Sequence, residues 1–256
     1  MLGGGCMNVN ALAKVATKAG MILLESGAET FRVEDTMRRI VLAYGASVVD
    51  SYATPTLIII SFTLDDELCH NVKRTQIKSV DLTKIDKVNE LSRQIQVLNI
   101  PLDEFNKALD EINRSEHYPK WIQMLGAAIC TFGFTFFFFG GLKDAIWAFV
   151  LGWVLKFMLL KLDEIEFSSF FKNIVGGAFV TFVALVLAKL KLCNNLDTLI
   201  ISVYMLLVPG LAITNAIRDT VSGDTVSGMA RAMEAVLTAV AIAFGSGLIF
   251  MIMGGY

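Results

Sequence analysis

Two polar segments of this chain hold residue types that could bind a small molecule or carry a proton. In the first segment, Glu25 and Glu29 lie four residues apart, a spacing that can pair carboxylates for acid–base chemistry. Gly27 interrupts the helix between them, and Arg32 is placed to neutralise Glu29. The pattern therefore favours a salt-bridged helix junction over a catalytic site. The acidic residues that complete this segment are Glu34 and Asp35.

The second polar segment lies inside an apolar stretch and contains Pro209-Gly210, followed by Asn215 and Arg218. Proline removes a backbone donor and kinks or breaks a helix, so carbonyl groups near Val208 lose their partners. At membrane depth such groups are tolerated only against protein or a water-filled cavity. One interpretation is a substrate site in which Arg218 attracts a carboxylate and Asn215 orients it. The other is a packing kink with a positively charged anchor, and the spacing supports both equally.

The loop that follows repeats the pattern Asp-Thr-Val-Ser-Gly, beginning at Asp219 and again at Asp224. Its hydroxyl and carboxylate groups can cap the next helix. If either aspartate is buried, it could also carry a coupling proton. A solvated loop explains the same residues, so both interpretations stay open.

The sequence contains none of the motifs that mark nucleotide sites or common hydrolases, such as GxGxxG, a Walker loop, HExxH or GxSxG. The four cysteines are scattered and the two histidines lie near none of them, so no zinc signature is present. We therefore expect no catalytic residues, no metal and no cofactor, and no enzyme. Both halves of the chain are nearly neutral, which argues against a nucleic-acid partner.

The apolar residues are concentrated in the second part of the chain. Residues 1–120 contain 14 Lys/Arg and 16 Asp/Glu, whereas 121–256 contain eight of each. A membrane span needs about 20 mostly apolar residues. Five stretches meet this requirement, and they predict a multi-pass protein in a lipid bilayer. They are 121–139, 142–160, 170–190, 196–217 and 229–253.

The positive charges between these stretches predict the orientation. If the N-terminus is cytoplasmic, seven Lys/Arg lie on the cytoplasmic side and three on the opposite side. The seven are Arg114, Lys120, Lys156, Lys161, Lys172, Arg218 and Arg231, and the three are Lys143, Lys189 and Lys191. We therefore expect a protein of the cytoplasmic (inner) membrane, with its N-terminus inside and its C-terminus outside.

The first part of the chain alternates between helical and extended patterns. Helices are predicted at 9–25, 28–44, 84–98 and 102–113, and strands at 46–52, 56–63 and 71–77. These elements predict two domains: an α+β cytoplasmic domain at 1–117 and a transmembrane domain at 118–256. The predicted fold class is an α+β N-terminal soluble domain followed by an all-α bundle of five transmembrane helices.

Several motifs, taken in order, resemble the threonine/serine exporter family, in particular its N-terminal half, the YjjP type. They are Ser26-Gly-Ala-Glu-Thr-Phe-Arg-Val-Glu-Asp-Thr36, Thr54-Pro-Thr56, Val208-Pro-Gly210, Asn215-Ala-Ile-Arg-Asp219, Ser222-Gly-Asp224 and Ser227-Gly228. The resemblance covers nearly the whole chain. It implies export of small metabolites without ATP hydrolysis: threonine and serine for full-length members, and dicarboxylates such as succinate for split members.

The resemblance also implies which residues matter and what the chain works with. Its signature in the first part of the chain is Glu29, Arg32, Glu34 and Asp35, and in the membrane part Pro209, Gly210, Asn215, Arg218, Asp219 and Asp224. A fused family member would continue into a second half where this chain ends. We therefore expect a second small membrane subunit of the YjjB type, and an oligomer is possible.

These observations lead to one main hypothesis and one alternative. The main hypothesis is a subunit of a secondary exporter whose small-molecule substrate binds at the six membrane-part residues. An odd number of spans with a single Pro-Gly break offers no internal inverted pair, which is the usual basis of a transporter site. The alternative is a membrane-anchored sensor or scaffold whose first domain binds a metabolite or regulator.

Overall fold

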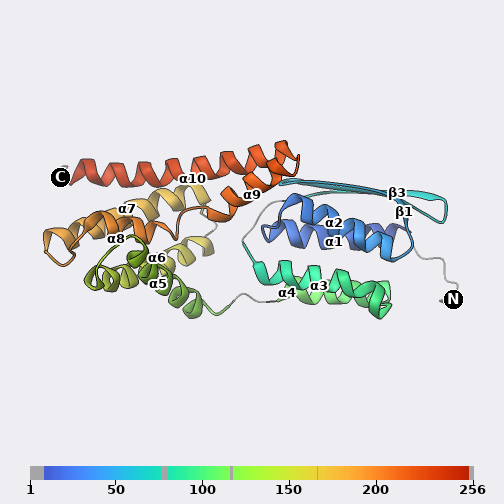
Figure 1. Cartoon of the computed structure of the whole chain (residues 1–256), viewed down its shortest axis with the longest axis horizontal. Coiled ribbons are helices and arrows are strands. Elements are labelled where there is room, and N and C mark those ends of the chain that lie inside the picture. The colour runs from blue at the N-terminus through green and yellow to red at the C-terminus, as the bar shows by residue number, and fades with distance from the viewer. Residues whose placement is uncertain (1–8, 76–79, 116–117, 166, 254–256) are drawn as a thin grey trace. The chain divides into compact units, whose positions relative to one another are not determined.

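The computed structural model describes residues 9–75, 80–115, 118–165 and 167–253 (Figure 1). The chain divides into two compact units. The first unit combines Met1–Glu116 with Leu211–Ala232, and the second combines His117–Gly210 with Met233–Tyr256. The last residues of the predicted strand 71–77, together with Cys6 and His117, lie outside the described residues.

The first unit is built on a three-stranded antiparallel sheet of order β1-β2-β3. Its strands are β1 (Ser47–Thr54), β2 (Leu57–Leu64) and β3 (Glu67–Arg74), and its helices are α1 (Val9–Glu25), α2 (Thr30–Ala43), α3 (Leu82–Leu98) and α4 (Leu102–Arg114). Figure 1 shows α1 and α2 between the sheet on one side and α3 and α4 on the other.

The core of the first unit follows from the period-2 pattern of β2. Ile58, Ile60 and Phe62 are fully buried on one face, and their neighbours along the strand are only half-buried. This face packs in one apolar cluster with residues of α1 and α2, including Leu12 and Met37. Because alternate side chains of a strand point to opposite faces, one apolar face of this strand is enough to bind the sheet to the helices.

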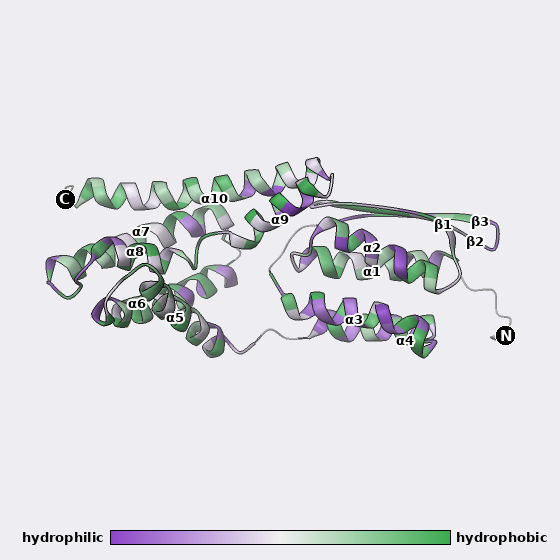
Figure 2. Cartoon of the chain, in the orientation of Figure 1, coloured by the Kyte–Doolittle hydropathy of each residue, from purple (hydrophilic) through white to green (hydrophobic). Residues whose placement is uncertain are grey.

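The second unit contains helices and connecting turns, and no strand is found among its described residues. It contains α5 (Lys120–Phe137), α6 (Leu142–Glu164), α7 (Ser169–Lys189) and α8 (Leu196–Tyr204). The last two helices, α9 (Gly210–Val221) and α10 (Thr225–Ile252), contribute to both units. Figure 2 shows the hydrophobic character of α6, α7 and α10, in contrast with the hydrophilic residues along α3 and α4.

The predicted fold class, an α+β N-terminal soluble domain followed by a bundle of five transmembrane helices, is wrong. The structure is mostly helical with one small sheet, and within the described residues three helices, not five, are long and apolar enough to cross a membrane. These three helices are α6, α7 and α10.

Two local features explain the lower number of spans. The expected span 196–217 is divided into α8 and α9 because Pro209 has no N–H to donate to the carbonyl of Met205. The expected span 121–139 forms α5, an 18-residue helix with Lys120, Trp121 and Gln123 in its first turn. Length and polarity together place this helix below the usual requirement of about 20 apolar residues.

Glycines allow α7 and α10 to approach each other closely in the second unit. A Cβ atom at Gly177 would lie 2.6 Å from the carbonyl oxygen of Ile242, and one at Gly245 would lie 2.0 Å from the carbonyl oxygen of Ile174. Small residues let helix backbones pack closely in membrane proteins. The crossing therefore depends on the absence of side chains at these two positions.

Candidate functional site

The turn between α1 and α2 is a helix C-cap that leaves two carbonyl groups for other partners. Gly27 has a φ of 87°, and its N–H bonds the carbonyl of Leu24 while the N–H of Ala28 bonds that of Leu23. These two bonds define a Schellman motif, which requires a left-handed residue at the position of Gly27. The carbonyl groups of Gly27 and Ala28 are bonded instead by side chains from α9 and α10.

The repeated pentapeptide forms the turn between α9 and α10. Gly223, which ends the first copy, has a φ of 96°, and the N–H of Asp224 bonds the carbonyl of Asp219 in a second Schellman motif. Asp224 begins the second copy and caps α10, because its Oδ1 accepts a hydrogen bond of 3.2 Å from the N–H of Ser227. The two copies therefore end one helix and start the next.

Asp219 caps the N-terminus of α2 from a distant part of the chain. Its Oδ1 accepts hydrogen bonds from the N–H of Thr30 at 3.2 Å and from the hydroxyl of Thr30 at 2.9 Å. Glu29, the residue that precedes α2, makes no side-chain cap of its own. A carboxylate is favourable at a helix N-terminus because the first N–H groups are unpaired and the helix dipole is positive there.

Arg231 completes this arrangement from α10. Its Nε lies 3.0 Å from Oδ2 of Asp219, and the two side chains are only 3% and 1% exposed. These two atoms are not aligned as a hydrogen bond, so their contact is an ion pair. The Nη2 of Arg231 donates to the carbonyl of Ala28 at 2.6 Å, and Nδ2 of Asn215 donates to that of Gly27 at 2.9 Å. We call Thr30, Asn215, Asp219 and Arg231 the junction cluster.

A second ion pair lies at the edge of the junction cluster and is more exposed. Arg218 pairs with Oε1 of Glu29, and their side chains are 54% and 16% exposed. Arg32 also approaches Glu29, with 3.7 Å between Nη2 and Oε2. Solvent weakens such pairs, so this one can open at far lower cost than the buried pair of Asp219.

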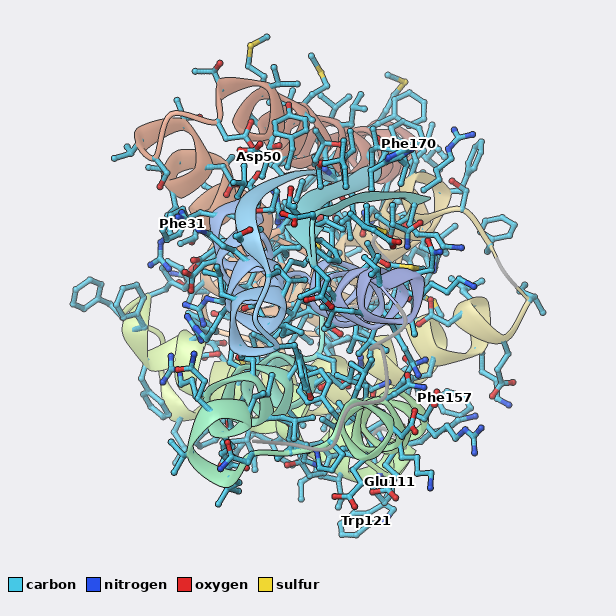
Figure 3. All side chains as sticks on the ribbon, turned by 90° about the vertical axis from the view of Figure 1, so that its right-hand side faces the viewer. Phe31, Asp50, Glu111, Trp121, Phe157 and Phe170 are labelled. Carbon is cyan, nitrogen blue, oxygen red and sulfur yellow. The ribbon has the colours of Figure 1, made fainter. Side chains whose placement is uncertain are left out.

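Glu34 lines a polar pocket and is bonded to β1. Its Oε1 accepts a hydrogen bond of 2.8 Å from the N–H of Ala53 on β1. Burial raises the pKa of Glu34, the charges of Asp224 and Asp219 raise it further, and the hydrogen bond from Ala53 opposes this rise. The pocket is open to solvent and has a volume of about 230 Å³. It is lined by Phe31, Glu34, Asp35, Arg38, Val49, Asp50 and Ser51. Figure 3 labels Phe31 on α2 and Asp50 on β1, which mark its two walls.

The comparison with known protein families covers almost all of this structure. Residues 14–253 match the family model described as "Putative threonine/serine exporter". The chain belongs to this family. The resemblance carried by the sequence motifs is thereby confirmed, and the apolar helices and the transporter relatives together identify a membrane protein.

Relatives of this exporter-family chain differ in length and in the substrate that their names give. The chain is 27% identical over 248 residues to the "Threonine/serine exporter" of Corynebacterium glutamicum, covering 94% of this chain and 51% of that protein. It is 25% identical over 227 residues to the "Probable threonine/serine exporter" of Mycobacterium tuberculosis, covering 88% and 43%. The chain thus spans about half the length of these two relatives.

A shorter relative matches along most of its own length. The "Probable succinate transporter subunit YjjP" of Escherichia coli is 21% identical over 230 residues, which cover 89% of this chain and 90% of that protein. No solved structure matches the chain.

Only some of the family signature residues lie close to one another. Glu29, Asn215, Arg218 and Asp219 come together around the α1–α2 turn. Asp35 pairs with Arg39 along α2, away from the junction cluster, and Arg32 is largely exposed. Pro209 and Gly210 lie where α8 has ended and α9 begins.

The sequence interpretation missed two members of the junction cluster, Thr30 and Arg231. Arg231 was counted only as a positive charge near a membrane surface. An arginine within an apolar helix is a functional signal in itself, because an unpaired charge there is costly. Thr30 lies within a signature motif, but nothing local to it predicts a partner 189 positions away.

The second unit holds a cluster of hydroxyl groups at the crossing of α7 and α10. Oγ1 of Thr181 lies 2.5 Å from the hydroxyl oxygen of Tyr204 and 2.9 Å from Oγ of Ser246. The carbonyl of Gly177 accepts from Thr181 at 2.9 Å and from Tyr204 at 3.1 Å. Thr181 therefore bonds its own helix and also joins α7 to α8 and α10.

Neither cluster has the composition of a metal centre. Within the described ranges, no three His, Cys, Asp or Glu side chains converge in a way that could hold a metal ion. The junction cluster combines one buried aspartate, one buried arginine and neutral donors.

Proposed function

We propose that this chain is a subunit of a secondary exporter that moves small carboxylate-bearing metabolites out of the cytoplasm. The substrates are threonine- and serine-like amino acids or dicarboxylates such as succinate. Family membership supports the proposal, as do the printed names of the relatives and the three helices that can cross a membrane. The sequence contains no nucleotide-binding loop, which is consistent with transport driven by a gradient.

The observation that carries the proposal is the meeting of the two signature segments after the Pro209-Gly210 break. Asp219 and Arg231 hold the α9–α10 turn against the start of α2 through buried contacts. The neighbouring pair of Arg218 and Glu29 is accessible to solvent. A substrate carboxylate can replace Glu29 on Arg218, because a guanidinium binds carboxylates through paired hydrogen bonds.

The other residues of the proposed substrate site assist the replacement of Glu29 by a substrate carboxylate on Arg218. Asn215 and the backbone opened at Pro209 and Gly210 orient the substrate, and Asp219 and Asp224 hold the α9–α10 turn. Opening of the pair between Arg218 and Glu29 would then accompany substrate binding.

We propose that transport requires a second small membrane subunit, of the YjjB type, in the cytoplasmic membrane. The succinate-transporter relative is named a subunit, and the chain spans about half of the two named exporters. The distribution of Lys and Arg in the sequence supports a cytoplasmic N-terminus and a C-terminus outside.

A second candidate function is a membrane-anchored sensor or scaffold. It is favoured by the hydrogen bonds that already occupy Asn215 and Asp219, because these residues then act as fixed connectors between turns. In that case the polar pocket beside Glu34 would bind the regulator.

Efflux from proteoliposomes that contain this chain and its partner subunit distinguishes the two candidates. Vesicles loaded with threonine, serine or succinate should release the substrate only when both subunits are present. Arg218→Ala should reduce the rate at least 10-fold, whereas Arg32→Ala removes a more remote charge beside Glu29 and should change it less than twofold. Wild-type rates in correctly inserted Arg218→Ala would refute the site, and no efflux of any of the three substrates would favour the sensor.

A further inference from the structure

The carboxyl group of Glu34 has two different environments, one on the protein side and one on the solvent side. The proposed exporter function assigns no role to Glu34. On one side its carboxyl group is fixed by the N–H of Ala53 and lies within the electrostatic influence of Asp219 and Asp224. On the other side it lines the solvent-open pocket between α2 and β1. A carboxyl group with this placement has both a fixed position near the junction cluster and a route to water.

Asp219 already has partners for both of its carboxylate oxygens. Its Oδ1 accepts from the N–H and the hydroxyl of Thr30, and its Oδ2 faces the guanidinium of Arg231. All of these contacts use the carboxylate as an acceptor or an anion. Asp219 is therefore committed to holding the junction cluster together.

Asp224 is also engaged, because it caps the first turn of α10 through the N–H of Ser227. Glu34 differs from both aspartates, since no ion pair to it is found in the described ranges and the one hydrogen bond found to its carboxyl group comes from a neutral backbone amide. Glu34 can therefore gain or lose a proton without breaking an ion pair or a helix cap.

The charged groups that surround Glu34 come from three parts of the first unit. α2 contributes Asp35, which is paired with Arg39, and Arg38, which lines the pocket. β1 contributes Asp50, and the α9–α10 hairpin contributes Asp219 with its partner Arg231, and Asp224. Acidic groups thus face Glu34 from each of these elements, and the buried guanidinium is already committed to Asp219.

These carboxyl groups do not form a metal site. Across the part of the chain that the structure describes, no three acidic, histidine or cysteine side chains lie close enough together to hold a metal ion. Glu34, Asp35 and Asp50 nevertheless line the same pocket, and a proton on Glu34 removes one of its negative charges.

We propose that Glu34 is the proton-binding residue of this protein, loaded from the pocket between α2 and β1 and sensed by the α9–α10 hairpin through Asp219 and Asp224. This inference rests on the proposed exporter function for its role in coupling, but not for the existence of the proton site. With the proton bound, Glu34 is neutral and no longer repels the two aspartates. When the proton is released, the restored charge disfavours the closed junction, so the proton and the hairpin position are linked.

The proton site can be tested without transport. We would titrate the purified full-length chain in detergent and follow the infrared carboxyl band as a difference spectrum between the wild type and Glu34→Gln. A carboxyl group that titrates above the ordinary glutamate range should appear in the wild type and vanish in Glu34→Gln. The same signal should remain in Glu104→Gln, which removes an exposed glutamate of α4 in the same unit.

Transport tests the coupling. In vesicles with the partner subunit, Glu34→Gln should make efflux independent of pH across the range in which the wild-type rate changes at least fivefold. Glu34→Asp retains a carboxyl group and should retain the pH dependence, which distinguishes proton binding from a folding defect. The proposal is overturned if the infrared signal persists in Glu34→Gln or if this variant keeps the wild-type pH profile. A wild-type complex that exports nothing would refute the exporter function, and the infrared result would still decide the proton site.

Discussion

Asp219 and Arg231 form a buried ion pair with 3.0 Å between Oδ2 and Nε, and their side chains are only 1% and 3% exposed. The pair holds the α9–α10 turn, and Asp219 also accepts a hydrogen bond from the N–H of Thr30, the first residue of α2. Because both charges are removed from water, each stabilises the fold only while the other is present.

Removing one member of this pair should therefore destabilise the protein strongly. We expect Asp219→Ala to lower the free energy of unfolding by about 3–5 kcal/mol, because Arg231 is left buried without its counter-charge. Arg218→Ala removes the exposed pair with Glu29 and should cost at most about 1 kcal/mol. Denaturant unfolding of the detergent-solubilised chain measures both values, and equal losses would contradict the burial argument.

The close approach of α9 and α10 should depend on Gly228. A Cβ atom at this position would lie 2.0 Å from Oγ1 of Thr220 and 2.9 Å from the carbonyl oxygen of Ala216. Gly228→Ala should separate the two helices, lower the unfolding free energy by about 1–3 kcal/mol and reduce efflux. Gly247→Ala is the matched control, since it lies on the same helix with no atom within 4 Å of the added Cβ. An unchanged melting temperature for Gly228→Ala would show that the helices can adjust.

The hydroxyl cluster of the second unit should contribute to its stability through Thr181. Thr181→Val keeps the shape of the side chain but leaves Tyr204 and Ser246 without a shared partner. We expect a loss of about 1–3 kcal/mol, the usual cost of unsatisfied buried polar groups. Thr135→Val removes a hydroxyl that bonds only the carbonyl of Thr131 in its own helix, and it should cost less. Thermal unfolding in detergent compares the two variants, and an equal shift would argue against a cooperative cluster.

The stability of the first unit should fall at alkaline pH through Tyr44. Burial raises the pKa of Tyr44 to about 12 from the ordinary tyrosine value of 10.0, and its hydroxyl donates to the carbonyl of Ile100 at 2.9 Å. Between these two values the unfolded chain releases this proton while the folded chain retains it. Stability is therefore fully present below pH 10 and declines as the pH rises towards about 12.

Phenylalanine substitution isolates this effect. Tyr44→Phe should remove this part of the alkaline decline in the unfolding free energy, whereas Tyr52→Phe, at an exposed tyrosine of β1, should leave the slope unchanged. Identical pH profiles for the wild type and Tyr44→Phe would contradict the assignment.

Local patterns in the sequence predicted much of the secondary structure. The alternation in β2 and the helical periodicity of α1 depend on neighbouring residues, so they can be read directly from the chain. Pro209 predicted a break for a local reason too, although its consequence was underestimated: it ends α8 and divides the expected span in two. The prediction of five spans failed because the average hydropathy of a segment does not show two local features. One is a polar first turn, as in α5, and the other is an interruption of the helix, as between α8 and α9.

The features of the candidate site can likewise be divided into those predicted from the sequence and those found only in the structure. The sequence alone determined the family, and its ordered motifs predicted roles for Glu29, Asn215, Arg218 and Asp219 that remain predictions. Only the tertiary structure decided that Asp219 caps α2 and pairs with Arg231. Only the tertiary structure also showed that Glu34, which lines a solvent-open pocket, is influenced by the charges of Asp219 and Asp224. The physical reason is that Asp219 meets Thr30, 189 positions away in the sequence, only when the chain has folded, and no local pattern encodes such a contact.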